Sequence, residues 1–173
     1  PTLKGLKDLG TDFKGFLYAG LMIQDNEPYL IEYNVRMGDP ECQTILPKLE
    51  NDLMDVIIAC INLKLDNIDL KWHDEKSLCV VLCSKGYPDE FKSNIEIKNL
   101  NKLNINDSGM EFLFHAGTKT KNEKILSNGG RVLNFVKKST SFKKSREDII
   151  KLINDLNWSN GYFRKDIGYK VID

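Results

Sequence analysis

The stretch that decides the fold is residues 30–41, which read LIEYNVRMGDPE. Successive side chains of a β-strand point to opposite faces, so alternating polar and apolar residues are separated onto two faces. Glu32, Asn34 and Arg36 then share one face with Leu30. The other face collects apolar residues that can pack into a core: Ile31, Tyr33 and Val35. A plain solvated face of an antiparallel sheet gives the same pattern, so the following residues have to decide.

The residues after this strand add two carboxylates, Asp39 and Glu41, in a turn made rigid by proline. Mg²⁺ prefers oxygen ligands and is usually held by few protein groups plus substrate phosphates, which suits Glu32 and Asn34. The guanidinium of Arg36 can grip a carboxylate or a phosphate through parallel hydrogen bonds. Metal ligands, a cation and spare carboxylates so close together indicate phosphoryl transfer to a carboxylate.

Composition narrows the class of protein. The chain has 173 residues, of which 41% are hydrophobic, enough for one domain or a small domain plus part of another. Lysine plus arginine and aspartate plus glutamate number 25 each, so we expect neither nucleic acid nor a membrane surface as a partner. No apolar run approaches the roughly 18 residues that span a bilayer.

The cysteines are typical of free thiols. Cys42, Cys60, Cys79 and Cys83 form no Cys-x-x-Cys pair, and the two histidines lie far apart in sequence, so a zinc site is not expected. Buried thiols in a reducing compartment fit this spacing. Because no secretory signal is visible at the start either, we expect a cytoplasmic protein.

The first part of the chain is predicted to form a hairpin followed by a loop. Apolar runs at residues 15–23 and 28–36 flank Asp25 and Asn26, which favour a tight reversal between two strands. Residues 37–43 contain a glycine and a proline and are predicted to be an irregular loop.

An apolar stripe at helical spacing predicts a helix over residues 49–64, with Asn51 or Asp52 capping its start. Together with the hairpin, this helix gives residues 1–70 the pattern of the end of an α/β unit. A connector then leads to a segment with a different pattern, residues 75–173, which is predicted to be a small, mostly β domain closed by one helix. The predicted fold class is therefore α+β.

Short strands separated by turn signals are predicted in this second segment, at residues 77–84, 94–100, 111–118, 124–138 and 162–172. The sequence Asn128-Gly129-Gly130 predicts a hairpin turn, because glycine permits positive φ. A helix is predicted over residues 145–158, with Ser145 as its N-cap. Its buried face would consist of Ile149, Ile150, Ile153 and Leu156. The lysines near its start, at positions 137, 138, 143 and 144, are predicted to form a solvated patch.

At this point the motifs match a family. The Glu-x-Asn-x-Arg strand resembles the last metal-binding strand of the ATP-grasp ligases. Over nearly the whole chain, five segments resemble the carboxy-terminal portion of the phosphoribosylamine–glycine ligases, also called glycinamide ribonucleotide synthetases. They are GFLYAGLMI (15–23), IEYNVRMGDPECQ (31–43), FHAGT (114–118), NGGRVL (128–133) and RKDIG (164–168).

The resemblance implies a reaction of de novo purine biosynthesis. ATP phosphorylates the carboxylate of glycine, and the amine of 5-phosphoribosylamine displaces the phosphate to give glycinamide ribonucleotide, ADP and phosphate. Glu32 and Asn34 would hold Mg²⁺ or Mn²⁺ against the ATP phosphates, and Arg36 would steady the glycine carboxylate or the acyl phosphate. Asp39 and Glu41 would line the acceptor side. Leu21 or Met22 would floor the adenine pocket.

The chain departs from the family pattern in two respects. Residues 19–21 carry no carboxylate, whereas many ATP-grasp enzymes place a further metal ligand there; the phosphoribosylamine–glycine ligases share this feature. The amino-terminal domain, central domain and nucleotide-clamping lid of these enzymes are expected to lie upstream of this chain, as its missing partner. Two alternatives stay open: another ATP-grasp carboxylate–amine ligase, or a non-catalytic fragment that binds a partner chain.

Three further residues have roles that the sequence leaves open. His115 in FHAGT would contact substrate or form hydrogen bonds within the β domain. Lys119 and Arg131 would meet a ribose phosphate or serve only the local fold. Arg164, Lys165 and Asp166 are expected to hold the last strand on the domain.

Overall fold

The structure of this chain is a computed structural model, which describes residues 2–105 and 108–172. The chain divides into two compact units. The first unit takes residues up to 42 together with 49–73, and the second takes residues 43–48 together with 74 onward. Helices and antiparallel sheets are both present, so the predicted α+β class is confirmed. Among the described residues, no helix is both long and apolar enough to span a membrane.

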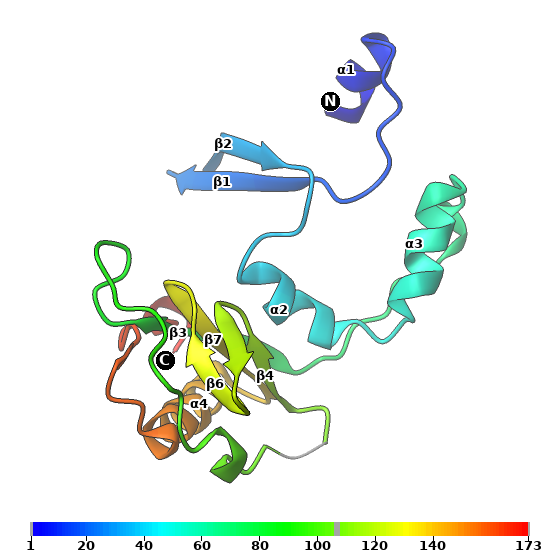
Figure 1. The fold of residues 1–173 in the computed structure, drawn as a ribbon. Coiled ribbons are helices and arrows are strands. Elements are labelled where there is room, and N and C mark those ends of the chain that lie inside the picture. The colour runs from blue at the N-terminus through cyan, green and yellow to red at the C-terminus, as the bar shows by residue number, and fades with distance from the viewer. Residues whose placement is uncertain (1, 106–107, 173) are drawn as a thin grey trace. The chain divides into compact units, whose positions relative to one another are not determined.

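The first unit is built around a two-stranded antiparallel sheet, β1 (Tyr18–Gln24) and β2 (Glu27–Asn34), which Figure 1 shows as the blue pair of arrows. Asp25 and Asn26 connect the strands with φ angles of 51° and 63°, as a two-residue turn of the type I′ class requires. The predicted hairpin is therefore confirmed. The remaining elements of this unit are α1 (Thr2–Asp8), α3 (Leu53–Ile61) and a 3₁₀ turn (Leu65–Asn67).

A β-bulge changes which side chains share a face of this hairpin. Gly20 pairs with Glu32, but Leu21 pairs with Leu30, so Ile31 is the extra residue on β2. Directly paired residues lie on the same side of a sheet, while successive residues alternate. Leu30 therefore lies on the face opposite Glu32, and the prediction that they share a face was wrong.

Two boundaries of the first unit also differ from prediction. The loop expected over residues 37–43 gives way at Glu41 to a short helix, α2 (Glu41–Ile45), which a 3₁₀ turn (Leu46–Lys48) continues. The helix predicted over 49–64 begins only after Asp52, whose carboxylate accepts a hydrogen bond from the Met54 amide at 2.7 Å. Leu49 instead forms an isolated β-bridge with Trp72, which removes the first predicted turn of the helix.

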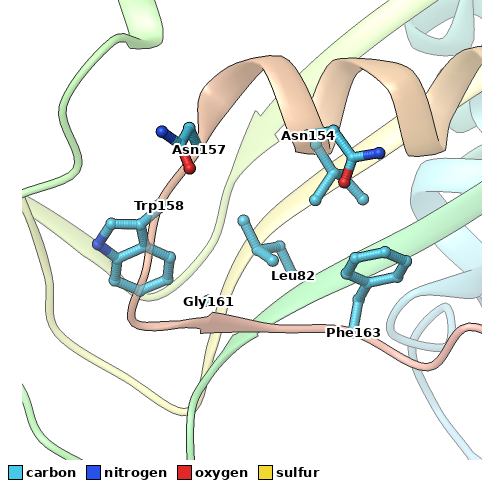
Figure 2. Close-up of a pocket in the computed structure, with 7 residues that line it drawn as sticks. Leu82, Asn154, Asn157, Trp158, Gly161 and Phe163 are labelled. Carbon is cyan, nitrogen blue, oxygen red and sulfur yellow. The ribbon is translucent and has the colours of Figure 1, made fainter.

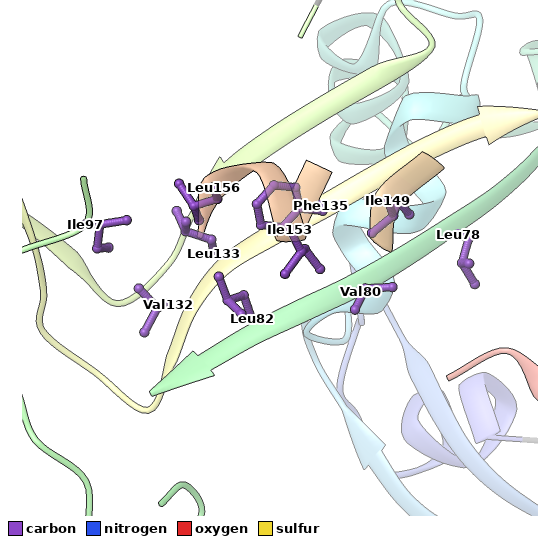
Figure 3. Close-up of a cluster of buried hydrophobic side chains, with 10 residues drawn as sticks. All are labelled: Leu78, Val80, Leu82, Ile97, Val132, Leu133, Phe135, Ile149, Ile153 and Leu156. Carbon is purple, nitrogen blue, oxygen red and sulfur yellow. The ribbon is translucent and has the colours of Figure 1, made fainter. Parts of the chain in front are cut away.

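The second unit is a four-stranded antiparallel sheet with one helix packed on it. The strand order is β4 (Glu111–His115), β7 (Arg131–Ser139), β3 (Lys76–Ser84) and β8 (Gly161–Tyr162). Helix α4 (Phe142–Leu156) contacts β3 and β7. The core between them is drawn in Figure 3 and contains Leu78, Val80, Leu82, Ile97, Val132, Leu133, Phe135, Ile149, Ile153 and Leu156.

A separate hairpin of β5 (Thr118–Lys121) and β6 (Lys124–Ser127) precedes β7. Residues 128–130 therefore connect two different sheets, and the predicted 124–138 hairpin is wrong. Gly129 and Gly130 do not have positive φ; they are required for space instead. A Cβ on Gly130 would lie 2.0 Å from the Tyr87 ring, and one on Gly129 would lie 3.2 Å from the Gly117 Cα.

Two predicted strands are largely absent. Residues 94–100 contribute only an isolated bridge between Glu96 and Leu126, and a 3₁₀ turn (Leu100–Lys102) follows. Of the strand predicted over 162–172, only Tyr162 pairs with β3, and the chain ends in a 3₁₀ turn (Tyr169–Val171). Gly168, with φ of 78°, turns the chain away from the extended conformation.

Helix α4 begins earlier than predicted. Ser141, not Ser145, is the N-cap, and its hydroxyl accepts from the Lys144 amide at 3.2 Å. Ser145 is a buried helical residue whose hydroxyl lies 2.8 Å from that of Ser139. Of the predicted buried face, Ile149, Ile153 and Leu156 are buried. Ile150 is only half-buried.

The predicted solvated lysine patch is wrong for the two lysines that belong to β7. Lys138 is buried, its ammonium donates to the Pro47 carbonyl at 2.7 Å, and it lies over the Phe112 ring. Lys137 is mostly covered and pairs with Glu111 at 2.5 Å and with Asp148 at 3.6 Å. Both positions fall on the long central strand: Lys137 lies on the face next to α4, beside Asp148, and Lys138 lies on the other face, beside Phe112.

Candidate functional site

The predicted metal ligands lie together at the end of β2. The Asn34 amide donates a hydrogen bond to a Glu32 carboxylate oxygen at 2.8 Å, so both side chains occupy one face of the hairpin. Gly20 lies opposite Glu32, and a Cβ there would lie only 3.1 Å from the Glu32 Cγ. The missing side chain at Gly20 therefore gives the Glu32 carboxylate room to lie across β1.

The donor set fits a hard divalent cation that is completed by other ligands. Because the Asn34 amide nitrogen faces Glu32, the amide oxygen is left as an acceptor beside the carboxylate. Within residues 2–105 and 108–172, no three histidine, cysteine, aspartate or glutamate side chains are grouped to hold a metal ion. Glu32 and Asn34 therefore suit a cation whose remaining ligands are water or phosphate oxygens.

Tyr18 joins this face, although the sequence did not single it out. It opens β1 directly opposite Asn34, and its hydroxyl is hydrogen-bonded to the Glu41 carboxylate. Partial burial raises the pKa of Tyr18 above its ordinary value, and the charges of Glu41 and Glu32 raise it further. The signal that could have found it is the hairpin register, because position 18 pairs with position 34 once the two-residue turn is placed.

Glu41 is folded back over Gly38. A Cβ on Gly38 would lie 2.2 Å from the Glu41 Oε2, and the Cys42 amide donates to the Gly38 carbonyl at 2.9 Å. Gly38 is also the one residue classed as buried among the described residues of the first unit. The Gly38–Glu41 turn therefore brings a second carboxylate to the Tyr18 hydroxyl.

Arg36 and Asp39 follow the strand instead of lying on it. Because β2 ends at Asn34, Arg36 lies outside the strand, and strand alternation does not place its side chain on the same face as Glu32. The Arg36 guanidinium donates to the Met37 carbonyl at 2.9 Å and is exposed. Asp39 lies close enough to Cys42 for its charge, after burial, to raise the pKa of that thiol.

The two residues predicted to contact adenine lie on opposite faces of the hairpin. Leu21 and Met22 are successive residues of β1, so their side chains point to opposite faces, and both are more than half exposed. At most one of them can face a given nucleotide. A pocket of about 350 Å³ in the first unit is lined instead by residues around α3, among them Phe13, Leu17 and Cys60.

The motif residues of the second unit lie on different faces. The His115 Nδ1 is 3.0 Å from the Thr118 hydroxyl, and His115 pairs with Leu133, whose side chain belongs to the core under α4. A register shift separates Leu133 from Arg131, which pairs with Cys83 and lies on the opposite face. Burial raises the pKa of the Cys83 thiol, and the positive charge of Arg131 acts in the other direction. The structure therefore does not bring His115 and Arg131 together.

The remaining motif residues form local contacts. Lys119 is exposed on β5. Arg164 and Asp166 form a bidentate ion pair with each other, at 3.1 and 2.7 Å, and do not pair a final strand to the sheet. The Lys165 carbonyl accepts a hydrogen bond from Arg146 on α4.

Figure 2 shows a surface pocket at the end of α4, with a volume of about 190 Å³. Trp158 and Phe163 stand on either side of Leu82, and the Asn154 and Asn157 amides lie above it on the helix end. No residue of the FHAGT, NGGRVL or metal-binding motifs lines this pocket. Its size is below the range of ordinary ligand pockets, so the hairpin face stays the stronger candidate.

Comparisons with known proteins bear on both units. Residues 77–170 match the family described as "Phosphoribosylglycinamide synthetase, C domain". Residues 1–42 match the family described as "Phosphoribosylglycinamide synthetase, ATP-grasp (A) domain". The order of the two matches is the order of the two units along the chain.

Curated relatives and a solved structure agree with these matches. The chain is 42% identical over 168 residues to a phosphoribosylamine–glycine ligase of Fusobacterium nucleatum, covering 97% of this chain and 39% of that protein. It is 39% identical over 173 residues to the ligase of Brucella melitensis, covering 100% and 40%. The crystal structure of phosphoribosylamine–glycine ligase from Thermotoga maritima is similar with a TM-score of 0.76 at 29% identity, covering 95% of this chain and 40% of that one. The chain thus spans about 40% of the length of these relatives.

Proposed function

This chain belongs to the phosphoribosylglycinamide synthetase family, and we propose that it forms the carboxy-terminal part of an enzyme that joins glycine to 5-phosphoribosylamine using ATP. The observation that carries the proposal is the shared face of Glu32 and Asn34, with their side chains 2.8 Å apart on a strand matched by the ATP-grasp family. The product would be glycinamide ribonucleotide, with release of ADP and phosphate, in the cytoplasmic synthesis of purines.

The proposed reaction has two steps. In the first, a glycine carboxylate oxygen attacks the γ-phosphorus of ATP, which forms glycyl phosphate and releases ADP. In the second, the amine of 5-phosphoribosylamine attacks the acyl carbon, phosphate leaves with the bonding electron pair, and the nitrogen loses a proton. Both steps develop negative charge on phosphate oxygens, so they need cationic groups held in place beforehand.

Glu32 and Asn34 would hold Mg²⁺ or Mn²⁺ through one carboxylate and one amide oxygen. The cation would neutralise charge on the ATP phosphates when bound. Arg36 is exposed just after the strand, where its planar guanidinium can reach an incoming carboxylate or acyl phosphate. Asp39 and Glu41 would attract the ammonium group of glycine and the amine nucleophile, and Leu21 or Met22 would contact adenine.

The exposed apolar residues of the hairpin support the view that the chain is one part of a larger enzyme. On β1 and β2 and just after them, Leu21, Met22, Ile23, Leu30, Ile31 and Val35 are all more than half exposed. Exposed apolar residues on both faces of a hairpin ordinarily mark surfaces that other parts of a protein cover. We propose that the remaining part of the enzyme, about 60% of the length of the relatives, covers this surface and supplies the rest of the nucleotide site.

The test is the kinetics of the complete enzyme with Glu32→Gln and Asn34→Ala. Each variant is expected to lower turnover by at least about a hundredfold, equivalent to about 2.7 kcal/mol of barrier, without loss of folding. Glu27→Gln is the matched control, because it makes the same change on an exposed residue at the other end of β2. Near-normal turnover of both variants at saturating Mg²⁺ would remove the metal assignment.

The isolated chain offers a second test. Since it presents two metal ligands open to water, it is expected to bind Mg-ATP only weakly and to form no product. Isothermal titration of Mg-ATP into the chain, with a product assay alongside, measures this. Micromolar binding together with glycine-dependent ADP release would show that the chain is a self-sufficient enzyme.

A further inference from the structure

Lys138 is a buried cation of the second unit. It is only 4% exposed, on the central strand β7 and on the sheet face away from α4. Its ammonium donates a hydrogen bond to the Pro47 carbonyl at 2.7 Å and lies 5.9 Å from the centre of the Phe112 ring, which stacks on Phe114. A lysine is almost never this deeply buried without partners, because its ammonium loses its hydration. The carbonyl and the ring are contacts that offset the burial of Lys138.

Pro47 belongs to a segment that passes from one unit to the other and back. Residues 43–48, the linking segment, group with the second unit, whereas the residues before and after them group with the first. The linking segment contains the last three residues of α2 and the 3₁₀ turn that follows. Carbonyls at the end of a helical segment lack donors within it, and a positive charge is favourable there. Lys138 supplies both the donor and the charge, and so ties the linking segment to β7.

Helix α2 extends this attachment to a residue of the proposed active site. Its first residue is Glu41, and the Cys42 amide donates to the Gly38 carbonyl at 2.9 Å, which joins the helix to the preceding turn. We propose that Lys138 is a positioning residue, which anchors the linking segment and thereby restricts the motion of Glu41. This rests on the proposed function, in which Glu41 attracts an ammonium group or an amine. A carboxylate whose motion is restricted before the substrate arrives loses less freedom on binding, so the substrate binds more tightly.

The first arm of the test measures amide hydrogen exchange in the complete enzyme and needs no activity. Lys138→Met keeps an unbranched apolar side chain beside Phe112 and removes both the donor and the charge. It is expected to speed exchange in the linking segment about tenfold or more and to leave exchange in β3 and α4 unchanged. The matched control is Lys76→Met, the same change at the exposed first residue of β3. Unchanged exchange in the linking segment would overturn the proposal. Loss of folding, or equal acceleration throughout the second unit, would overturn it as well, because Lys138 would then have only a general structural role.

The second arm measures the kinetics of the complete enzyme. Lys138→Met is expected to raise the KM for glycine and for 5-phosphoribosylamine about three- to tenfold, part of the effect of a lost hydrogen bond to a charged group, and to leave the KM for ATP unchanged. Lys76→Met is expected to change none of these values. Equal changes in all three KM values, or none, would overturn the positioning role. The two proposals fail separately, because loss of the metal assignment would show in the turnover of Glu32→Gln, whereas loss of the anchor would show in the exchange of residues 43–48.

Discussion

Phe135 of β7 and Ile31 of β2 are both apolar strand residues, yet Phe135 is fully buried and Ile31 is 64% exposed. The same contrast holds along the two sheets. In the second unit α4 covers the sheet, and the core contains residues from β3, β7 and the helix. In the first unit the hairpin has no such cover within the described residues. Apolar residues of a strand are therefore buried in the second unit, where a helix packs on the sheet, and exposed in the hairpin of the first unit.

The largest expected effect comes from removing a core side chain. Phe135→Ala is expected to lower the free energy of unfolding of the second unit by about 3–5 kcal/mol, because it leaves a cavity among fully buried neighbours. Ile31→Ala is expected to change the stability of the chain by less than about 0.5 kcal/mol, since its side chain is already in water.

The fluorescence of Trp158 reports the unfolding of the second unit, because this side chain packs against its core. Urea unfolding followed by its fluorescence, in a Trp72→Phe background, isolates that unit from the tryptophan of the first. If Ile31→Ala proved as costly as Phe135→Ala, the hairpin would have to contribute a core of its own, and the contrast between the units would fail.

Much of the second unit could be predicted from its sequence because its apolar residues meet one another. The strand at 77–84 and the buried residues Ile149, Ile153 and Leu156 follow from periodicity alone. The start of α4 could not be predicted as well. Ser141 and Ser145 are both serines at a plausible cap position, and only the structure, in which the Ser141 hydroxyl accepts from the Lys144 amide, shows which one caps the helix.

The candidate site was predictable in its chemistry but not in its geometry. Glu32 and Asn34 were identified from alternation and do share a face. The bulge at Ile31 could not be predicted, because a single extra residue leaves no mark on the apolar pattern. Tyr18 was missed for a related reason, since its role arises from cross-strand pairing and from a carboxylate that follows β2 in the chain.

The next effect in size compares one ion pair from each unit. Lys137 and Glu111 lie 2.5 Å apart, each only 13% exposed, so Lys137→Met would leave a covered carboxylate without its main partner. We expect a loss of about 2–3 kcal/mol, somewhat below the cost of breaking a fully buried pair. His73 and Glu50 of the first unit are 3.7 Å apart and far more exposed, so His73→Gln is expected to cost less than about 0.5 kcal/mol.

Urea unfolding of the two variants at low and high salt measures this difference. A Lys137→Met protein as stable as the parent would show that the covered pair contributes little beyond its own desolvation. The two units would then not differ in how much their ion pairs contribute to stability.

Helix caps give a smaller effect. Ser141→Ala removes the acceptor for the Lys144 amide and is expected to lower the stability of the second unit by about 1 kcal/mol. Asp52→Ala removes the acceptor for the Met54 amide and is expected to act only locally, as faster amide hydrogen exchange within α3. Amide hydrogen exchange measured by mass spectrometry on both variants distinguishes a global loss of stability from a local one. Faster exchange throughout the second unit in Asp52→Ala would contradict the prediction that the loss stays within α3.

The smallest expected effect is a pH dependence at the exposed Arg164–Asp166 pair. The two hydrogen bonds from Arg164 hold the pKa of Asp166 below its ordinary value. A carboxyl group with a lower pKa in the folded chain adds stability above its unfolded pKa, and this contribution disappears as the pH falls through the folded pKa. Tyr18 has the opposite sign, because its raised pKa adds stability to the first unit that is lost only as the pH rises through the folded pKa, in the alkaline range.

Comparison of the parent chain with Asp166→Asn measures the acid side. The parent is expected to have a slightly higher Tm for the second unit at pH 7, and the two Tm values are expected to converge as the pH falls through the lowered pKa of the folded carboxyl. Because both side chains of the pair lie in water, 0.5 M salt is expected to shrink the difference at pH 7 as well. A Tm difference that stayed constant from pH 7 to the acid end of the titration would mean that Asp166 acts through the uncharged contacts of its turn. The RKDIG segment would then owe its conformation to Gly168 and to the hydrogen bond between Arg146 and the Lys165 carbonyl.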